Sequence, residues 1–158
     1  MSAQHERVER AALDRLTHAP ALFDALVARD ERVCLFEKTV TMNDPGVAAQ
    51  RVTPSWPHHL PGELVIGLTG QAGMIACKLA GLIGDDWRGH GVRIVDARFS
   101  APVLVGETVL TRVEIGRVRR LGASAHVQLR FRMWKRDPAG GEIETYRSEQ
   151  HAIFFPPG

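Results

Sequence analysis

Residues 64–83 read LVIGLTGQAGMIACKLAGLI, and this stretch decides the fold. Its twenty residues contain a single charge, Lys78, so the stretch is long enough to cross a bilayer. A helix that is apolar on every side is equally typical of the centre of a folded protein. Because Thr69 and Gln71 interrupt the apolar run and amphipathic strand patterns surround it, we predict a buried central helix and no membrane association.

The composition is that of one folded domain spanning residues 1–158. Hydrophobic residues make up 44% of the chain and charged residues 24%, which argues against disorder. The formal net charge of +2 is too small to indicate nucleic-acid binding. Residues 1–15 are charged and lack an apolar core, so we expect no secretory signal and a cytoplasmic location.

Before the central stretch, the pattern changes from helix to strand to loop. Residues 5–29 have apolar side chains three and four positions apart, and Pro20 divides them, which predicts two short helices in an N-terminal extension over residues 1–30. Residues 33–42 alternate and are rich in β-branched side chains, as in a strand. A long loop over residues 47–62 follows, and ordered loops of this length are often functional.

After the central stretch, the pattern is that of antiparallel strands. We expect these strands at residues 92–99, 106–115, 125–134 and 142–155. Together with the first strand they predict an α+β fold, in which an antiparallel sheet of five to six strands wraps round one long central helix. One side of such a helix still needs cover, and a second copy of the chain is the simplest cover. We therefore expect a homodimer or a higher homo-oligomer.

Three glycines, Gly67, Gly70 and Gly73, recur at every third position of the central stretch. Glycine in a helix costs about 1 kcal/mol relative to alanine. Three of them indicate that another element, either the curved sheet or a partner helix, approaches the helix closely.

Two sequence motifs carry a resemblance to a known superfamily. The first is LPGEL at residues 60–64, followed by QAG at 71–73; the second is DARFSAPV at 96–103, followed by GET at 106–108. The first motif resembles the helix start of the β-hydroxyacyl-carrier-protein dehydratases. The second is similar to a stretch shared by those dehydratases and the MaoC-like (R)-specific enoyl-CoA hydratases. The resemblance implies the hotdog fold over roughly residues 33–155.

The first motif also has a physical interpretation. The first N–H groups of a helix have no partner within it, and the positive end of the helix dipole lies behind them. The resemblance implies that the Gly62 N–H binds the thioester carbonyl, which would be polarised there, and an enolate formed from it would be stabilised. The alternative is that Pro61 and Gly62 only begin a helix. Trp56, Thr69 and Gln71 are further candidates for binding the substrate.

The catalytic residues of the resembled families are missing from their usual positions. In the carrier-protein dehydratases a loop His and a helix Glu or Asp transfer the protons, and the aligned positions here hold Thr53 and Gly67. In the MaoC-like hydratases an Asp and a His lie five residues apart in the loop after the first strand. Asp44 matches that Asp, but the His position holds Ala49. Neither dyad is complete in this sequence.

Four residues remain as candidates for proton transfer: His58, His59, Glu63 and Asp44. Dehydration of a 3-hydroxyacyl thioester needs one group to take the α-proton and one to protonate the leaving hydroxyl, which suits a His and a carboxylate. Because His58 and His59 are adjacent, at most one faces a site in an extended chain, and each has the alternative role of a solvated loop residue. The alternative roles are a first-turn acid for Glu63 and a turn residue for Asp44.

The resemblance implies a protein that processes acyl thioesters carried by CoA or an acyl carrier protein. We expect a 3-hydroxyacyl dehydratase or enoyl hydratase with an unusual acid–base set. One alternative is a non-catalytic hotdog subunit that binds the acyl chain or pairs with an active dehydratase in a heterodimer. The other is an acyl thioesterase, for which the central helix offers no carboxylate beyond Glu63. No metal spacing is present among the His, Cys, Asp and Glu residues, and we expect neither a metal nor a cofactor.

Overall fold

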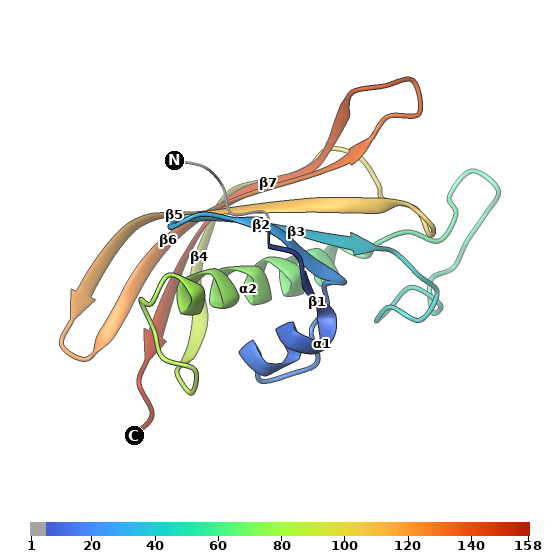
Figure 1. Cartoon of the computed structure of the whole chain (residues 1–158). Helices are drawn as coiled ribbons and strands as arrows, with labels where there is room; N and C mark the ends of the chain where they lie inside the picture. The colour runs from blue at the N-terminus through green and yellow to red at the C-terminus, as the bar shows by residue number, and fades with distance from the viewer. Residues whose placement is uncertain (1–5) are drawn as a thin grey trace.

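The helix α2 (Gly62–Leu79) lies under a strongly curved antiparallel sheet. The computed structural model describes residues 6–158, and Figure 1 shows the sheet arching over α2. The expected buried helix is confirmed, although it ends before Ile83. Gly81 adopts a left-handed φ of 69°, and the Leu82 N–H donates to the Cys77 carbonyl across it at 3.0 Å. This is a typical helix C-terminus that glycine makes possible.

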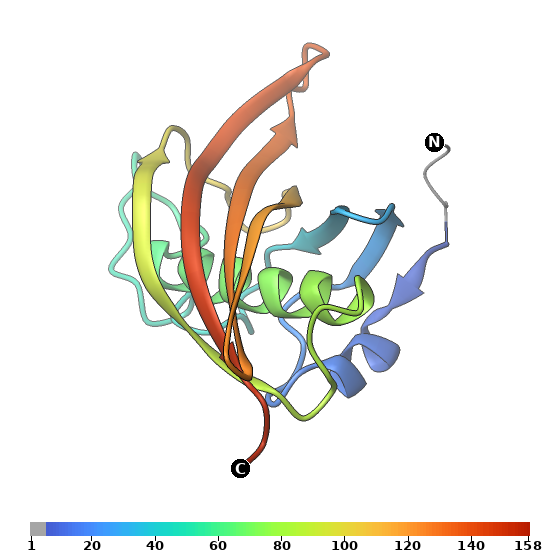
Figure 2. The ribbon, with the colours of Figure 1, turned by 90° about the vertical axis from the view of Figure 1, so that its left-hand side faces the viewer.

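Within the described part of the chain, seven strands form the sheet in the order β1-β2-β3-β5-β6-β7-β4, and all neighbouring pairs are antiparallel. Figure 2 shows how β4 and β7 curve round the side of the helix. The strands are β1 (Val8–Glu9), β2 (Ala25–Arg29), β3 (Val33–Thr39), β4 (Arg88–Phe99), β5 (Thr108–Leu121), β6 (Ser124–Arg136) and β7 (Glu142–Phe155). The four strands expected after the helix are all present, and β7 has the expected bounds.

The N-terminal prediction was partly wrong. The structure has a short helix α1 (Arg10–Leu13), continued by a 3-10 turn η1 (Asp14–Leu16), but the second expected helix is the strand β2. Leu26 pairs with Phe36 of β3, and both side chains are buried. A short apolar run fits a helix or a strand equally well. Here the run forms a strand because β3 has an edge with which it pairs. Residues 1–5 of the expected extension lie outside the described residues.

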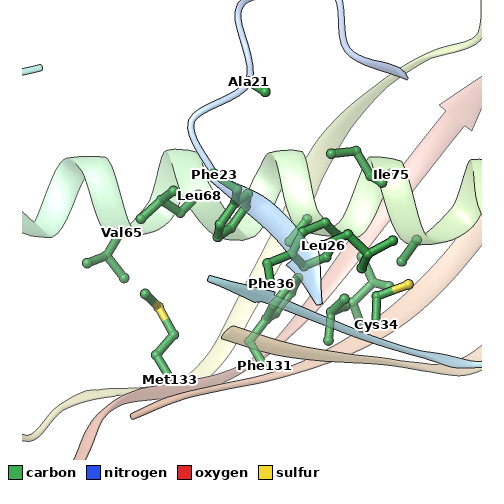
Figure 3. Packing of buried hydrophobic residues seen from close by; sticks show 14 of the residues in the cluster. Ala21, Phe23, Leu26, Cys34, Phe36, Val65, Leu68, Ile75, Phe131 and Met133 are labelled. Atoms are coloured by element: carbon green, nitrogen blue, oxygen red, sulfur yellow. The ribbon is translucent and has the colours of Figure 1, made fainter. Parts of the chain in front are cut away.

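The core lies between the inner face of the sheet and α2. Figure 3 shows Val65 of the helix directed towards Met133 of the sheet and Leu68 beside Phe23. Ile75 belongs to the same buried cluster. Close packing against the sheet explains the glycine at position 73, because a Cβ at Gly73 would lie 2.6 Å from Leu129 Cδ1. Gly70 has no such neighbour among the described residues.

The chain itself covers part of the outer face of α2. The Gln71 side chain accepts a hydrogen bond from the Leu22 N–H at 2.8 Å and donates one to the Pro20 carbonyl at 2.9 Å. The Lys78 ammonium, whose pKa is lowered by burial, donates to the Leu16 carbonyl at 2.8 Å. The N-terminal segment therefore occupies part of the face for which we expected a second copy. No helix within residues 6–158 has the length and apolar character needed to cross a membrane.

Candidate functional site

A cavity of about 270 Å³ opens at the start of α2, and we call it the N-terminal cavity. Its wall comes from the loop before the helix, the first helical turn, the end of β4 with the loop after it, and the first part of β7. The lining residues are Trp56, His59, Leu60, Gly62, Val65, Phe99, Ser100, Ala101, Pro102, Val103, Thr145 and Tyr146. Three of the predicted site residues, Trp56, His59 and Gly62, therefore share one cavity.

The two sequence motifs meet beside this cavity. The Leu60 N–H donates to the Val103 carbonyl at 2.8 Å. His59 and Leu104 are paired in an isolated antiparallel β-bridge. Glu107 holds this segment, because its carboxylate accepts from the Leu104 N–H and from the Lys135 ammonium, both at 2.7 Å. Residues of the second motif thus fix the loop that carries His59.

His59 has one ring nitrogen engaged and one available. Its Nδ1 lies 2.9 Å from the Pro57 carbonyl oxygen, which can only accept, so Nδ1 carries the hydrogen. In the neutral ring Nε2 then keeps its lone pair, as a general base requires. The backbone of His59 is held at two points by the Gln50 side chain, which accepts from its N–H and donates to its carbonyl, each at 3.0 Å.

His58 lies apart from the cavity. Its Nδ1 bonds the Val47 carbonyl at 2.9 Å, which ties this ring to the loop before the helix. The two adjacent histidines therefore face different surroundings, and only His59 lines the N-terminal cavity.

The start of α2 leaves amide hydrogens without acceptors. Pro61 is the N-cap residue and provides no side-chain cap, and its carbonyl accepts from the N–H groups of Leu64 and Val65. Within residues 6–158 the Gly62 and Glu63 amides have no acceptor. A Cβ at Gly62 would lie 3.6 Å from the Phe99 ring, so this amide sits at the wall of the cavity.

No carboxylate of residues 6–158 lines the N-terminal cavity. Asp44 forms a 2.6 Å ion pair with the buried Lys38, and its other oxygen accepts from the Thr41 N–H at 2.8 Å. Glu63 is exposed on the helix and does not line the cavity. The His–carboxylate pair that the sequence suggested is therefore not assembled within residues 6–158.

Thr69 and Gln71 line a second cavity of about 330 Å³ beside the middle of α2, here called the mid-helix cavity. The Thr69 hydroxyl donates to the Ile66 carbonyl and accepts from Gln150 Nε2, both at 2.8 Å. Gln71 is occupied by the N-terminal segment, as described above. Both residues have structural partners and stand away from the N-terminal cavity.

Thr145 and Tyr146 complete the N-terminal cavity and were missed by sequence reasoning. Neighbouring strand residues normally point to opposite faces, yet both are buried, with 3% and 1% of their surfaces exposed. The cause is a β-bulge: Tyr146 pairs with Met133 and Glu144 with Trp134, so Thr145 is an extra residue in β7. The sequence does carry a weak signal, because the outward charged residues change from a spacing of two to a spacing of three after Glu144.

Thiol chemistry and metal binding find little support in the described residues. Cys34 and Cys77 are free, and burial raises the pKa of each thiol to about 12, so neither is a reactive thiolate at neutral pH. Residues 6–158 contain no group of three or more His, Cys, Asp or Glu side chains arranged to hold a metal ion.

Comparison with known proteins identifies the fold. No protein-family model and no curated protein sequence matches the chain. Among solved structures, the dehydratase heterocomplex ApeI:P from Xenorhabdus doucetiae is similar, with 16% identity and a TM-score of 0.61 over 92% of this chain and 91% of that one. A thioesterase from Haemophilus influenzae has 16% identity and a TM-score of 0.57 over 96% and 93% of the two chains.

A 4-hydroxybenzoyl CoA thioesterase from Pseudomonas is also similar, with 13% identity and a TM-score of 0.54 over 80% of this chain and 88% of that one. At these identities the likeness establishes the fold alone. The chain has the hotdog fold, in the α+β class, and the resemblance inferred from its two motifs is confirmed at that level.

Proposed function

We propose that the N-terminal cavity binds the thioester of an acyl-CoA or acyl carrier protein, and that the protein interconverts 3-hydroxyacyl and enoyl thioesters. One observation carries the proposal: Gly62, whose amide at the helix N-terminus has no acceptor within residues 6–158, lines the same cavity as His59, whose Nε2 has no partner among those residues. Val65 and Phe99 give this cavity an apolar wall suited to an acyl chain.

The helix start supplies the electrostatic part of the reaction. With the thioester oxygen at the Gly62 N–H, the positive end of the α2 dipole draws electron density towards that oxygen. The α-proton becomes more acidic, and the enolate that forms is stabilised where its charge develops.

His59 supplies the proton transfer. Its Nε2 takes the α-proton from the substrate, and the resulting imidazolium returns that proton to the 3-hydroxyl group. The C–O bond then breaks, the electron pair of the enolate forms the double bond, and water leaves. His59 ends neutral, so one residue serves in turn as base and acid, and no carboxylate is required.

The solved structures with this fold are compatible with the proposal. One is described as a dehydratase heterocomplex and others as acyl-CoA thioesterases, and thioesterases act on the same kind of bond that we place at Gly62. A thioesterase fits this chain less well, because the central helix offers no carboxylate beyond Glu63 and Glu63 is exposed.

The test is mass spectrometry of the protein with enoyl, 3-hydroxyacyl and saturated acyl pantetheine thioesters. We expect a gain or loss of about 18 Da, the mass of water, and a fall of about 100-fold or more in His59→Gln. His58→Gln is the matched control, because this ring bonds Val47 outside the cavity, and it should retain turnover. Equal activity of the two variants would contradict the role of His59, and release of the free acid would favour a thioesterase.

A second candidate is favoured by the lack of a carboxylate lining the N-terminal cavity within residues 6–158. In this case the protein is a non-catalytic subunit that holds the acyl chain and pairs with an active dehydratase. Its signature would be tight binding of the thioesters without turnover, and gain of activity when a second hotdog protein is added.

We also propose that the protein works as a homodimer joined along β4. This strand lies at the edge of the sheet, and its Val92 and Ile94 side chains are 57% and 45% exposed. An open edge of this length is normally paired or covered. Residues of β4 line both cavities, so a second copy at this edge would wall both of them. Light scattering should give twice the chain mass of 17.4 kDa.

A further inference from the structure

We propose that Tyr146 and Thr145 form a receptor for the 3-hydroxyl group of the acyl chain and make the N-terminal cavity selective for hydroxylated over saturated thioesters. The proposal rests on the function proposed above. It assigns a specificity role to two residues of β7 that the resembled motifs do not contain.

The first support is the state of the two hydroxyl groups. Both are buried, and neither has a hydrogen-bond partner among the described residues. A buried hydroxyl without a partner costs stability, and such groups are rare in folded proteins. Both residues line the same cavity. We infer that a molecule bound there provides the missing partner.

The second support is the bulge that presents them. Without the extra residue in β7, Thr145 and Tyr146 would face opposite sides of the sheet. The bulge turns both inwards, and bulges of this kind often aim side chains at functional sites. The Tyr146 ring is held in turn by Phe99, whose centroid lies 4.8 Å away and which also flanks Gly62.

A third buried hydroxyl, that of Thr111, allows a comparison with Thr145 and Tyr146. Thr111 is fully buried and also lacks a hydrogen-bond partner within residues 6–158. It lies in the same row of the sheet as Tyr146, with Met133 between them. It lines neither cavity of α2. An unpaired hydroxyl alone is therefore not a site, and Thr111 provides a natural control.

The chemistry of two hydroxyl groups suggests their ligand. A hydroxyl both donates and accepts, whereas a carbonyl oxygen only accepts. An alcohol can therefore bridge Thr145 and Tyr146, giving a hydrogen to one and receiving one from the other. A saturated chain in the same place leaves both hydroxyls unpaired, and sites built in this way discriminate strongly against the analogue that lacks the polar group.

The experiment compares 3-hydroxybutyryl-CoA with butyryl-CoA. Binding is measured by calorimetry in a His59→Gln background, so that the proton transfer we propose does not consume the probe. We expect the hydroxylated probe to bind at least about tenfold more tightly, and Tyr146→Phe to abolish the difference. Thr111→Val should leave it unchanged.

The unliganded variants give an independent measurement. Because the Tyr146 hydroxyl has no partner among residues 6–158, Tyr146→Phe should melt at the same temperature as the parent protein or higher. A clearly lower melting temperature would mean that the hydroxyl has a structural partner, and it would overturn the inference. Retained discrimination in Tyr146→Phe would overturn it too, while leaving the proposed function intact. If neither probe binds to the parent protein, the proposed function fails and this role of Tyr146 fails with it.

Discussion

Two cavities lie along the same helix, and they differ in how their polar groups are satisfied. In the mid-helix cavity the hydroxyl of Thr69 and the amide of Gln71 are bonded to the chain itself. In the N-terminal cavity the hydroxyl groups of Thr145 and Tyr146 have no partner among the described residues. Polar groups that already have partners hold the fold together, whereas unpaired groups next to a cavity remain available for a ligand.

The difference also separates residues that look alike in the sequence. Gln50 and Gln71 each use one side-chain amide to make two backbone hydrogen bonds. Gln50 fixes His59 at the N-terminal cavity, and Gln71 fixes residues 20–22 against the middle of the helix. The same chemistry therefore supports the site at one end and the fold at the other.

The largest expected effect comes from filling the N-terminal cavity at Gly62. Gly62→Val should weaken thioester binding by at least about 100-fold, because the added side chain occupies the approach to the first amide of α2. Gly62→Ala is the control for folding, since its methyl group would stand at an ordinary 3.6 Å from Phe99. Thioester binding by calorimetry checks both, and unchanged binding in Gly62→Val would move the site elsewhere.

Substitution of Gln71 or Gln50 should give the next largest effect, on stability and on turnover. Gln71→Leu should lower the free energy of unfolding by about 1–3 kcal/mol, because the Leu22 N–H and the Pro20 carbonyl lose their partner. Thioester turnover should be retained. Gln50→Leu should also cost stability, but it should lower kcat in addition, because His59 loses both backbone anchors. Denaturant unfolding and steady-state rates separate the two, and identical effects on rate would contradict the distinction between the cavities.

The smallest effect concerns pH and Glu107. Partial burial raises the pKa of this carboxyl, but the hydrogen bonds from Lys135 and the Leu104 N–H outweigh it, and the pKa lies below its ordinary value. A depressed pKa means stability that is present above the ordinary value of about 4.3 and is lost as the pH falls through the folded-state pKa.

Melting temperatures between pH 7 and pH 3 should therefore fall more steeply for the parent protein than for Glu107→Gln. The exposed Glu63 is the matched control, because it makes no ion pair with the described residues. If Glu107→Gln and Glu63→Gln give the same pH dependence as the parent protein, Glu107 does not anchor the His59 loop.

Local patterns predicted most of the fold. The apolar run at 64–83 predicted the buried helix, and the alternating residues of β6 and β7 predicted their strands. The strand β2 was not predictable in the same way, because its five residues show no clear period and its pairing with β3 depends on contacts distant in the sequence.

The site residues were predictable only where they lie close together in the sequence. Trp56, His59 and Gly62 are neighbours in sequence, and the helix start brings them to one cavity. Tyr146 comes from a distant strand, and a bulge sets its direction. The change in charge spacing after Glu144 indicates the bulge but not the cavity that Tyr146 lines. Asp44 matched a family position, but the choice between catalysis and an ion pair depended on the buried Lys38.

The most direct test of the central claim is a crystal structure with a 3-hydroxyacyl pantetheine analogue in which an amide replaces the thioester. We predict that its carbonyl oxygen lies about 3 Å from the Gly62 nitrogen and its 3-hydroxyl against Tyr146. An acyl group bound in the mid-helix cavity, with the N-terminal cavity unchanged, would contradict the account.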